Sequence, residues 1–292
     1  RASHRTRNGY HLGCVRDLHR IFRRPPGSVL GLDAGSGCRT PSLNELPADF
    51  FIRHAREEVG STNDIARELA ETGAPEGTLV TARRQRSGRG RRGNTWESIE
   101  GNAFLSLILR PAATPQEAAQ LSFVAAVTVG DLMANLLPER AIQLKWPNDV
   151  LCNGQKISGI LLEAGPSGAD GLQWLIVGIG LNVVGKPASR PDATSLRDQG
   201  DRTSGAENVI AGFCERFLAW YRTWQEEGFE TIRAAWLTRA HGLAGPIQIR
   251  LQNGTVDAIF DGVDETGALL AQMADGSSRR VTGGEVHFGG TG

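Results

Sequence analysis

The chain has 292 residues, which is enough for one sizeable domain and a smaller one. Its 32 basic residues balance its 32 acidic residues, so no overall field attracts nucleic acid or an anionic membrane, and any such binding must be local. The four cysteines have no paired spacing and the chain has no long apolar run, which argues against a structural zinc site, a disulfide framework, secretion and a membrane span. We therefore expect a reduced, cytoplasmic protein.

The N-terminal 46 residues show no sustained helical or alternating period. Residues 1–46 are rich in Arg, Gly, Pro and Ser and carry an excess of positive charge, so they are predicted to be a disordered basic tail. A helix-turn-helix of the repressor type would need several amphipathic helices here, and the pattern contains none. No DNA binding is expected from this segment.

From residue 51 the pattern becomes that of a mixed domain. A strand, a turn and a helix come first, and the helix begins near residues 61–63, which are of the capping type. After it, apolar runs of strand length alternate with two helical segments. The predicted strands are 79–82, 103–109, 141–146, 149–152, 156–164 and 172–184, and the predicted helices are 115–137, which is amphipathic, and 204–240. The Asn153-Gly154 dipeptide indicates a hairpin between two of these strands.

The sequence pattern changes after Gly245, where short stretches of alternating apolar and polar residues are separated by glycine-containing turns. This spacing is typical of a small β-barrel. The sequence therefore predicts an α+β protein. The main domain would span 47–242, with a mixed, largely antiparallel sheet flanked by helices, and a small C-terminal barrel would span 243–292.

Residues 83–96, RRQRSGRGRRGNTW, form an arginine-rich loop between two predicted strands. Gly88, Gly90 and Gly93 keep its backbone mobile, so the arginines between them can swing onto an anion and back. Guanidinium groups suit both carboxylates and phosphates. A solvated basic loop or a nucleic-acid patch is the alternative, although Trp96 is the only stacking aromatic nearby.

Only three of the 32 basic residues are lysines, and two of them lie in the segment KWPNDVLCNGQKISGILLE at 145–163. Lys145 ends a strand that Pro147 terminates, and Lys156 lies on the returning arm of the hairpin. Paired strands can thus place two compact cations near one pocket. The alternative is an edge hairpin with solvent-facing lysines.

The segment GIGLNVV at 178–184 places Gly178 and Gly180 on one face of an apolar strand. Glycine weakens a strand unless something must approach its backbone closely. That neighbour is either a flat apolar ligand or a packed helix, and the sequence leaves both open.

Six motifs, in this order and at these spacings, resemble those of bacterial biotin protein ligases. They are STN at 61–63, Gln85 with GRGRRG at 88–93, KWPND at 145–149, KISGILLE at 156–163, GIGLN at 178–182 and GGE at 283–285. GRGRRG alone is weakly specific, whereas the ordered set, which extends over about residues 50–290, is highly specific. The resemblance implies the catalytic fold of this family, followed by an SH3-like barrel.

The resemblance also implies a reaction. Family members first join biotin to ATP, giving biotinyl-5′-adenylate and pyrophosphate, and then transfer the biotinyl group to one lysine of a carrier domain. No covalent enzyme intermediate is needed, which agrees with the lack of a nucleophile motif. We expect biotin as substrate, ATP and Mg²⁺ as cofactors, and the biotin carboxyl carrier domain of acetyl-CoA carboxylase, or of a related carboxylase, as partner.

The residues that match the family's motifs receive their roles by resemblance. Catalysis is assigned to Lys145, which would bridge the biotin carboxylate and the α-phosphate, and to Arg91. The biotin-binding residues are predicted to be Ser61, Thr62, Asn63, Gln85, Arg89, Gly90, Arg91 and Lys145. The ATP-binding residues are predicted to be Arg91, Arg92, Lys156 and Asn182. The metal ligands are left unassigned.

Two features depart from the family pattern. Residues 1–46 do not resemble the DNA-binding domain that some members carry, which favours the type without a repressor domain. No arginine or lysine follows Glu285, so the contacts of the small domain with ATP stay open. Lipoate ligases and octanoyl transferases share the fold and are the nearest alternative function. The resemblance permits a homodimer as well as a monomer.

Overall fold

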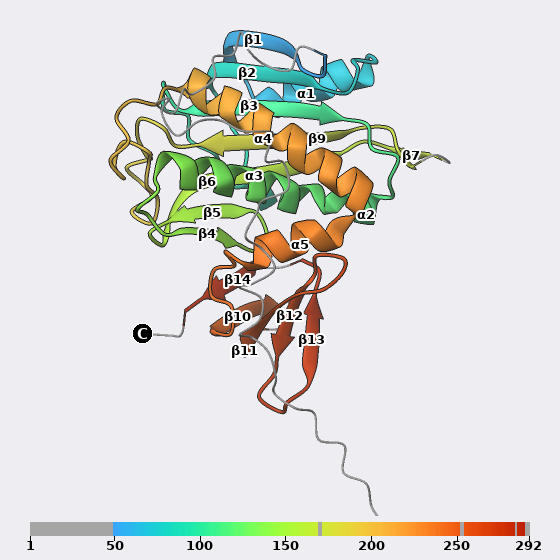
Figure 1. Cartoon of the computed structure of the whole chain (residues 1–292), viewed down its shortest axis with the longest axis vertical. Helices are drawn as coiled ribbons and strands as arrows, with labels where there is room; N and C mark the ends of the chain where they lie inside the picture. The colour runs from blue at the N-terminus through green and yellow to red at the C-terminus, as the bar shows by residue number, and fades with distance from the viewer. Residues whose placement is uncertain (1–48, 169–170, 252–253, 284, 290–292) are drawn as a thin grey trace, which may run out of the picture. The chain divides into compact units, whose positions relative to one another are not determined.

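The computed structural model describes residues 49–289 except 169–170, 252–253 and 284 (Figure 1). The predicted tail, 1–46, therefore lies outside the described residues. The main feature is a seven-stranded sheet in the order β1-β2-β3-β9-β6-β5-β4. Its strands are β1 (Ile52–Val59), β2 (Thr78–Gln85), β3 (Ala103–Leu109), β4 (Ile142–Lys145), β5 (Asp149–Cys152), β6 (Gln155–Ala164) and β9 (Leu175–Leu181).

The sheet is mixed and largely antiparallel, as the sequence predicted. Only β1 and β2 pair in parallel, and every other neighbouring pair is antiparallel. The strands β4, β5 and β6 follow one another as hairpins, and a small hairpin of β7 (Ser167–Gly168) and β8 (Gly171–Leu172) separates β6 from β9. All seven residues of β3 are buried, which explains why this strand reads as a continuous apolar run.

Helices cover both faces of this sheet. The face carrying Val80 and Ile108 packs on α1 (Thr62–Glu71), whereas the face carrying Leu79 and Leu107 belongs to the larger core with α3 (Leu121–Leu136) and α4 (Ala206–Glu227). Adjacent strand residues thus point to opposite faces, each of them apolar. The short α2 (Pro115–Ala119) precedes α3, and α5 (Phe229–Leu237) follows α4.

Both predicted long helices are divided. The segment 115–137 breaks at Gln120 into α2 and α3, and α3 is buried around most of its circumference, so the expected amphipathic helix is a core helix instead. Residues 115–136 are long and apolar enough to cross a membrane, but 67% of the relevant window is buried inside the protein. The segment 204–240 breaks at Gly228, whose φ of 79° ends α4.

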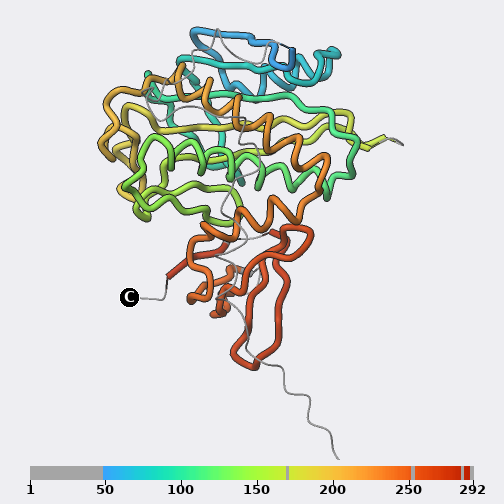
Figure 2. Tube along the Cα trace, in the orientation of Figure 1, coloured from blue at the N-terminus to red at the C-terminus, as the bar shows by residue number. Residues whose placement is uncertain are grey.

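The C-terminal residues form a second, five-stranded antiparallel sheet in the order β13-β12-β11-β10-β14, which is consistent with an SH3-like barrel. Its strands are β10 (Pro246–Leu251), β11 (Gly254–Val263), β12 (Leu269–Gln272), β13 (Ser278–Val281) and β14 (Glu285–Phe288). Figure 2 follows the chain from α5, in orange, into this sheet, in red. Both sheets belong to one compact unit, so the expected boundary near residue 243 stays a prediction.

The end of β4 is tied to the C-terminal sheet and to the segment leading into it. The Leu144 N–H donates to the Arg239 carbonyl (2.7 Å), and the Leu144 carbonyl accepts from the His241 N–H (2.9 Å). The Trp146 indole N–H donates to the Gly267 carbonyl of the C-terminal sheet (3.1 Å). The outer edge of β4 is thus closed by backbone, and the residue between these contacts is Lys145.

Candidate active site

One cavity of about 630 Å³ lies where α1, β2, β4, β6 and β9 approach one another. All the site residues predicted from the sequence line it: Ser61, Thr62, Asn63, Gln85, Arg89, Gly90, Arg91, Arg92, Lys145, Lys156 and Asn182. The C-terminal sheet contributes Val286 and His287 from β14. Residues far apart in the chain therefore converge on a single site.

The first turn of α1 forms a buried polar corner of this cavity. Gln85 Oε1 accepts hydrogen bonds from the Thr62 N–H (2.8 Å) and the Thr62 hydroxyl (3.1 Å). The Ser106 hydroxyl lies 2.8 Å from Thr62 Oγ1 and 2.5 Å from Asn63 Oδ1. Asn63 is only 3% exposed, yet its Nδ2 has no hydrogen-bond partner among the described residues. A buried amide donor without a partner is costly, which indicates that a ligand acceptor belongs there.

The two glycines of β9 make room for two different side chains. A Cβ at Gly178 would lie 2.2 Å from Asn63 Oδ1, so the first turn of α1 occupies this space. A Cβ at Gly180 would lie 2.3 Å from Trp96 Cε2, so the indole occupies the space beside Gly180. Close helix packing, one of the two explanations left open by the sequence, thus applies to Gly178. Gly180 faces a residue of the arginine loop, which neither explanation included.

Trp96 is a cavity residue that sequence reasoning did not assign to the site. Its ring lies against the positions of Gly159 and Gly180, and the Lys156 ammonium is 5.6 Å from a ring centroid. Its buried indole N–H has no hydrogen-bond partner among the described residues. The available signal is its position at the end of the arginine loop, where a single aromatic suggested only a nucleic-acid platform.

Lys145 ends β4 and points its ammonium toward the C-terminal sheet as well as the cavity. Nζ lies 5.5 Å from the ring centroid of Phe288, and the same ring contacts His241 (5.5 Å). Burial and the charge of Lys145 lower the pKa of His241, so His241 is neutral at pH 7 and adds no second charge there. No ion pair involves Lys145 within the described part of the chain.

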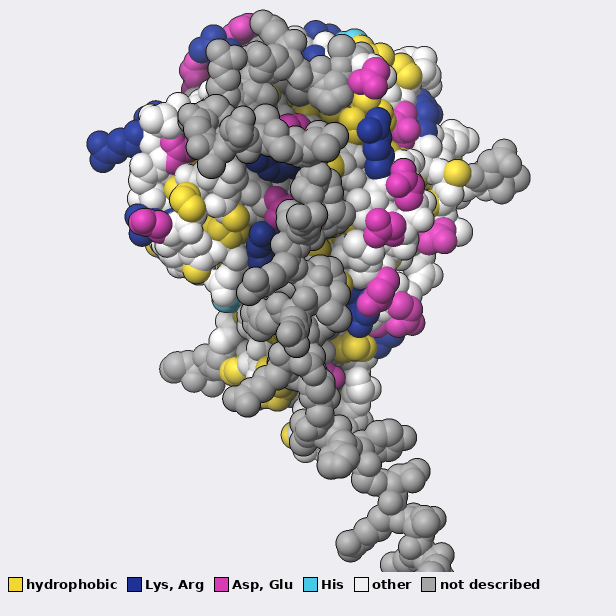
Figure 3. Space-filling model, in the orientation of Figure 1, with side chains coloured by type: hydrophobic (Ala, Val, Ile, Leu, Met, Phe, Trp, Pro, Cys, Tyr) yellow, Lys and Arg dark blue, Asp and Glu magenta, His cyan; other side chains and the backbone are white. Residues whose placement is uncertain are grey.

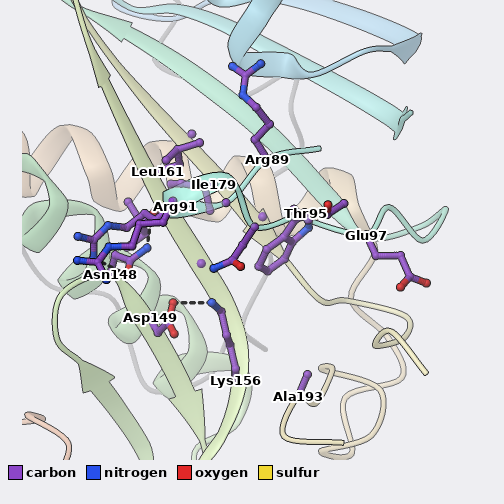
Figure 4. Close-up of a pocket in the computed structure, with 18 of the residues that line it drawn as sticks. Arg89, Arg91, Thr95, Glu97, Asn148, Asp149, Lys156, Leu161, Ile179 and Ala193 are labelled. Atoms are coloured by element: carbon purple, nitrogen blue, oxygen red, sulfur yellow. Dashed lines mark hydrogen bonds and ion pairs between the residues drawn. The ribbon is translucent and has the colours of Figure 1, made fainter. Parts of the chain in front are cut away.

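Lys156 is paired, in contrast. Its Nζ lies 2.6 Å from Asp149 Oδ1 of β5, drawn as the dashed line in Figure 4. Figure 4 also shows Arg91 beside Asn148, with Arg91 Nη1 3.3 Å from Asn148 Oδ1. Burial and the charge of Arg92 lower the pKa of Arg91, and the charge of Asp149 partly offsets this. Asn148 and Asp149 belong to the KWPND motif, but the sequence assigned a role only to its lysine.

Two further predicted site residues, Asn182 and Arg89, are also engaged with protein groups. Asn182 is buried, donates through Nδ2 to the Thr194 carbonyl (2.9 Å) and accepts from Asn102 Nδ2 (3.3 Å), so it shapes the cavity wall. Arg89 lies in ion pairs with Asp64 (2.5 Å) and Glu163 (3.0 Å), and it points away from Arg91 in Figure 4. Burial alone would lower the pKa of Arg89, but these two carboxylates raise it above its ordinary value.

Arg91 and Arg92 form a short 3₁₀ turn, Arg91–Gly93, in which Arg92 has a φ of 56° and is exposed. Neither is in an ion pair among the described residues. The cavity thus has a neutral, hydrogen-bonding corner at α1, and its other walls carry several cations together with the carboxylates Glu97 and Asp149. This arrangement suits an elongated ligand with an uncharged polar head and an anionic part.

Comparison with known proteins supports a specific family. A model described as "Biotin/lipoate A/B protein ligase family" matches residues 50–238, and one described as "Biotin protein ligase C terminal domain" matches residues 246–289. A biotin–[acetyl-CoA-carboxylase] ligase from Paracoccus denitrificans is 40% identical over 237 residues, covering 79% of this chain and 98% of that protein.

Two further relatives agree. The bifunctional ligase/repressor BirA of Bacillus subtilis is 34% identical over 291 residues, covering 97% of this chain and 86% of that protein. The solved biotin protein ligase from Aquifex aeolicus in complex with biotin and ATP is 27% identical, with a TM-score of 0.71 over 82% of this chain and 100% of that one. The chain therefore belongs to the biotin protein ligases of the biotin/lipoate ligase family.

Proposed function

We propose that the protein joins biotin to ATP, giving biotinyl-5′-AMP and pyrophosphate, and then transfers the biotinyl group to a lysine of a carrier domain. One observation carries this proposal: the Asn63 amide donor, which has no hydrogen-bond partner among the described residues, lines the same cavity as Lys145 and Arg91, which are in no ion pair among those residues. The ureido group of biotin is neutral and both donates and accepts hydrogen bonds, which suits the α1 corner. The biotin carboxylate and the ATP phosphates suit the cations.

In the first step a biotin carboxylate oxygen attacks the α-phosphorus and pyrophosphate leaves with the electrons of the broken bond. The two reactants are anions, and at about 4 Å unit charges repel by roughly 4 kcal/mol at an effective dielectric of about 20. Lys145 would bridge the carboxylate and the α-phosphate, since it carries the cavity cation fixed at a strand end. Arg91 would cover the adenylate from the loop side.

In the second step the neutral amine of the carrier lysine attacks the carbonyl carbon of the mixed anhydride, AMP leaves, and the amine loses a proton. This step needs orientation and exclusion of water more than further charge, because AMP is already a good leaving group. A closed arginine loop over the adenylate would keep water from hydrolysing it.

Mg²⁺ would enter with the nucleotide. The described residues contain no group of three or more His, Cys, Asp or Glu that could hold a metal ion. This fits Mg²⁺ bound mainly by phosphate oxygens and water, with one carboxylate at most. Asp149, which faces the cations of the cavity, is the residue that would supply it. When bound, the ion would neutralise charge on the leaving pyrophosphate.

The acceptor is proposed to be the biotin carboxyl carrier domain of acetyl-CoA carboxylase or of a related carboxylase, because the Paracoccus relative is named for that substrate. We further propose a cytoplasmic location. A homodimer would use β1, the sheet edge that no strand covers among the described residues, since backbone closes the β4 edge.

The two alternatives from the sequence are less well supported. Lipoate ligation is disfavoured because the relatives cited above are named biotin ligases. A nucleic-acid patch is disfavoured because Arg83, Arg84, Arg86 and Arg89 are all in ion pairs with carboxylates. Acidic side chains also interrupt the basic ones on the face shown in Figure 3. The expected lack of DNA binding stays a prediction.

The decisive experiment is calorimetric titration with biotin, followed by ATP and Mg²⁺, with pyrophosphate release measured in parallel. We expect tight biotin binding and release of pyrophosphate with biotin but not with lipoate. Adenylate formed only from lipoate would overturn the assignment. Nucleic acid bound at submicromolar strength in physiological salt, without biotin binding, would favour the nucleic-acid function.

A further inference from the structure

Four charged side chains form a closed set, here called the charge ring: Asp64, Arg67, Arg89 and Glu163. Of the four, Arg89 lines the cavity. Arg89 contacts Asp64 (2.5 Å) and Glu163 (3.0 Å), and Arg67 contacts the same two carboxylates at 3.7 Å and 2.8 Å. Two cations and two anions alternate, so the ring is neutral. All four side chains are partly buried, from 21% exposed at Glu163 to 39% at Arg67.

The ring joins three separate parts of the molecule. Asp64 and Arg67 lie one turn apart on α1, Glu163 lies near the end of β6, and Arg89 lies in the loop after β2. Asp64 follows directly after Asn63, the last of the polar-corner residues Ser61, Thr62 and Asn63, and Arg67 lies one turn further on. The ring therefore links the loop to the same helical turn that lines the proposed biotin site.

Residues 88–96, here called the arginine lid, fold as a small hairpin. The Trp96 N–H donates to the Gly88 carbonyl (2.9 Å), the Gly90 N–H donates to the Asn94 carbonyl (2.7 Å), and Arg89 and Thr95 form an antiparallel bridge. Among the described residues, Arg89 is the only residue of the lid in an ion pair with the rest of the protein. Arg91 has one contact of 3.3 Å to Asn148.

We propose that the charge ring latches the arginine lid over the adenylate, so that Arg89 is a positioning residue and Arg91 is the lid cation that meets the ligand. The two carboxylates fix Arg89 through separate nitrogens, Nη1 to Asp64 and Nη2 to Glu163, a geometry that lysine cannot reproduce. The two carboxylates thereby neutralise Arg89, whereas Arg91 is in no ion pair among the described residues. This inference rests on the proposed function, because it concerns the retention of biotinyl-5′-AMP.

The test uses Asp64→Asn with Glu163→Gln in one chain. This variant frees Arg89 and adds two units of net positive charge beside the cavity. If Arg89 were a ligand-binding residue, freeing it would hold the anionic adenylate as long or longer. If the ring is a latch, the adenylate is lost about tenfold faster despite the added positive charge, which corresponds to about 1.4 kcal/mol.

The matched control is Glu57→Gln with Glu100→Gln, which also removes two carboxylates that pair with an arginine, Arg83, outside the ring. Adenylate loss from the control should stay within about twofold of the unaltered protein. Arg67→Ala leaves both contacts of Arg89 in place and should have an effect smaller than the double variant. The melting temperature and the biotin affinity without ATP are measured for every variant. A variant that keeps both values has kept its fold, so faster adenylate loss from it reports the loss of the latch.

The measurement is single-turnover release of labelled biotinyl-5′-AMP after excess unlabelled adenylate is added, at low and high salt. Release from the unaltered protein should quicken with salt more than release from the double variant, because the variant has no ring to screen. Equal or slower release from a folded double variant would overturn the latch. Failure of the unaltered protein to form any adenylate would instead overturn the proposed function.

Discussion

Lys145 and Arg91 line the same cavity but are held in different ways. Lys145 ends a strand that pairs with β5 on one side and with the backbone of residues 239–241 on the other, and its ammonium faces Phe288. Arg91 lies in a short turn of the arginine lid with a single 3.3 Å contact to Asn148. The difference teaches that a strand can fix charge for the transition state, whereas a lid can supply charge that must later be withdrawn.

The largest effect is expected from Lys145→Ala. The variant lacks the cation proposed to lie between carboxylate and α-phosphate, so adenylate formation should fall at least about tenfold, or roughly 1.4 kcal/mol in barrier. Pyrophosphate release measures this. Lys186→Ala is the control, because Lys186 does not line the cavity, and its rate should be unchanged. Equal rates for both variants would remove Lys145 from its role.

Arg91→Gly should affect the retention of the adenylate and not its formation. The lid loses its ligand cation while the strand cation remains, so adenylate formation should change little and its escape should quicken by about tenfold. Escape is measured by adding a trapping excess of unlabelled biotinyl-5′-AMP. Arg92→Gly, on the exposed neighbour, should have the smaller effect. A variant that retains the intermediate as well as the unaltered protein does would contradict the lid.

The two glycines of β9 allow a second comparison between a fixed and a movable part of the site, because Gly178 faces α1 and Gly180 faces the arginine lid. At Gly178 an added Cβ meets Asn63, held in the first turn of α1, so Gly178→Ala should weaken biotin binding by about tenfold, within the range of overpacking costs. At Gly180 it meets Trp96 of the lid, which can shift, so Gly180→Ala should disturb biotin binding less. Calorimetry with biotin alone compares the two, and the reverse ranking would contradict the contrast.

The smallest effect is expected from Phe288→Leu. The cation–π contact with Lys145 disappears while an apolar side chain remains, so the catalytic rate should fall by about two- to fivefold, as a contact of about 0.5–1 kcal/mol allows. The Michaelis constant for biotin should stay unchanged, because the polar corner is untouched. A rate unaffected at saturating biotin would show that β4 alone seats the ammonium.

The sequence was most informative where local chemistry decides structure. A proline after an alternating run places Lys145 at a strand end, and glycines among arginines indicate a loop that can close. The strands β4, β5, β6 and β9 were likewise predicted, because turn residues and apolar runs are local signals, whereas the small β7–β8 hairpin was not. The two helix breaks were missed, since Gln120 and Gly228 interrupt segments whose apolar content continues on both sides.

The sequence predicted which residues line the cavity, but it did not predict which protein groups those residues contact. Arg89 was expected to bind the ligand, but it pairs with Glu163, which lies 74 positions away in the chain. No local sequence pattern predicts such an ion pair. The contact between Trp96 and Gly180 was missed for the same reason. The indole packs where Gly180 has no side chain, and the two residues meet only after the sheet has formed. Asn182 keeps its place beside the cavity but bonds to Asn102 and Thr194.

The aromatic ring over Lys145 belongs to β14, the last strand that the structure describes. Every segment from β1 to β13 is synthesised before that ring exists. A chain interrupted before β14 would contain the α1 corner and the arginine lid but would lack Phe288, so its Lys145 would have lost one of its supports. The full rate of adenylate formation is thereby expected only of protein whose synthesis has passed β14.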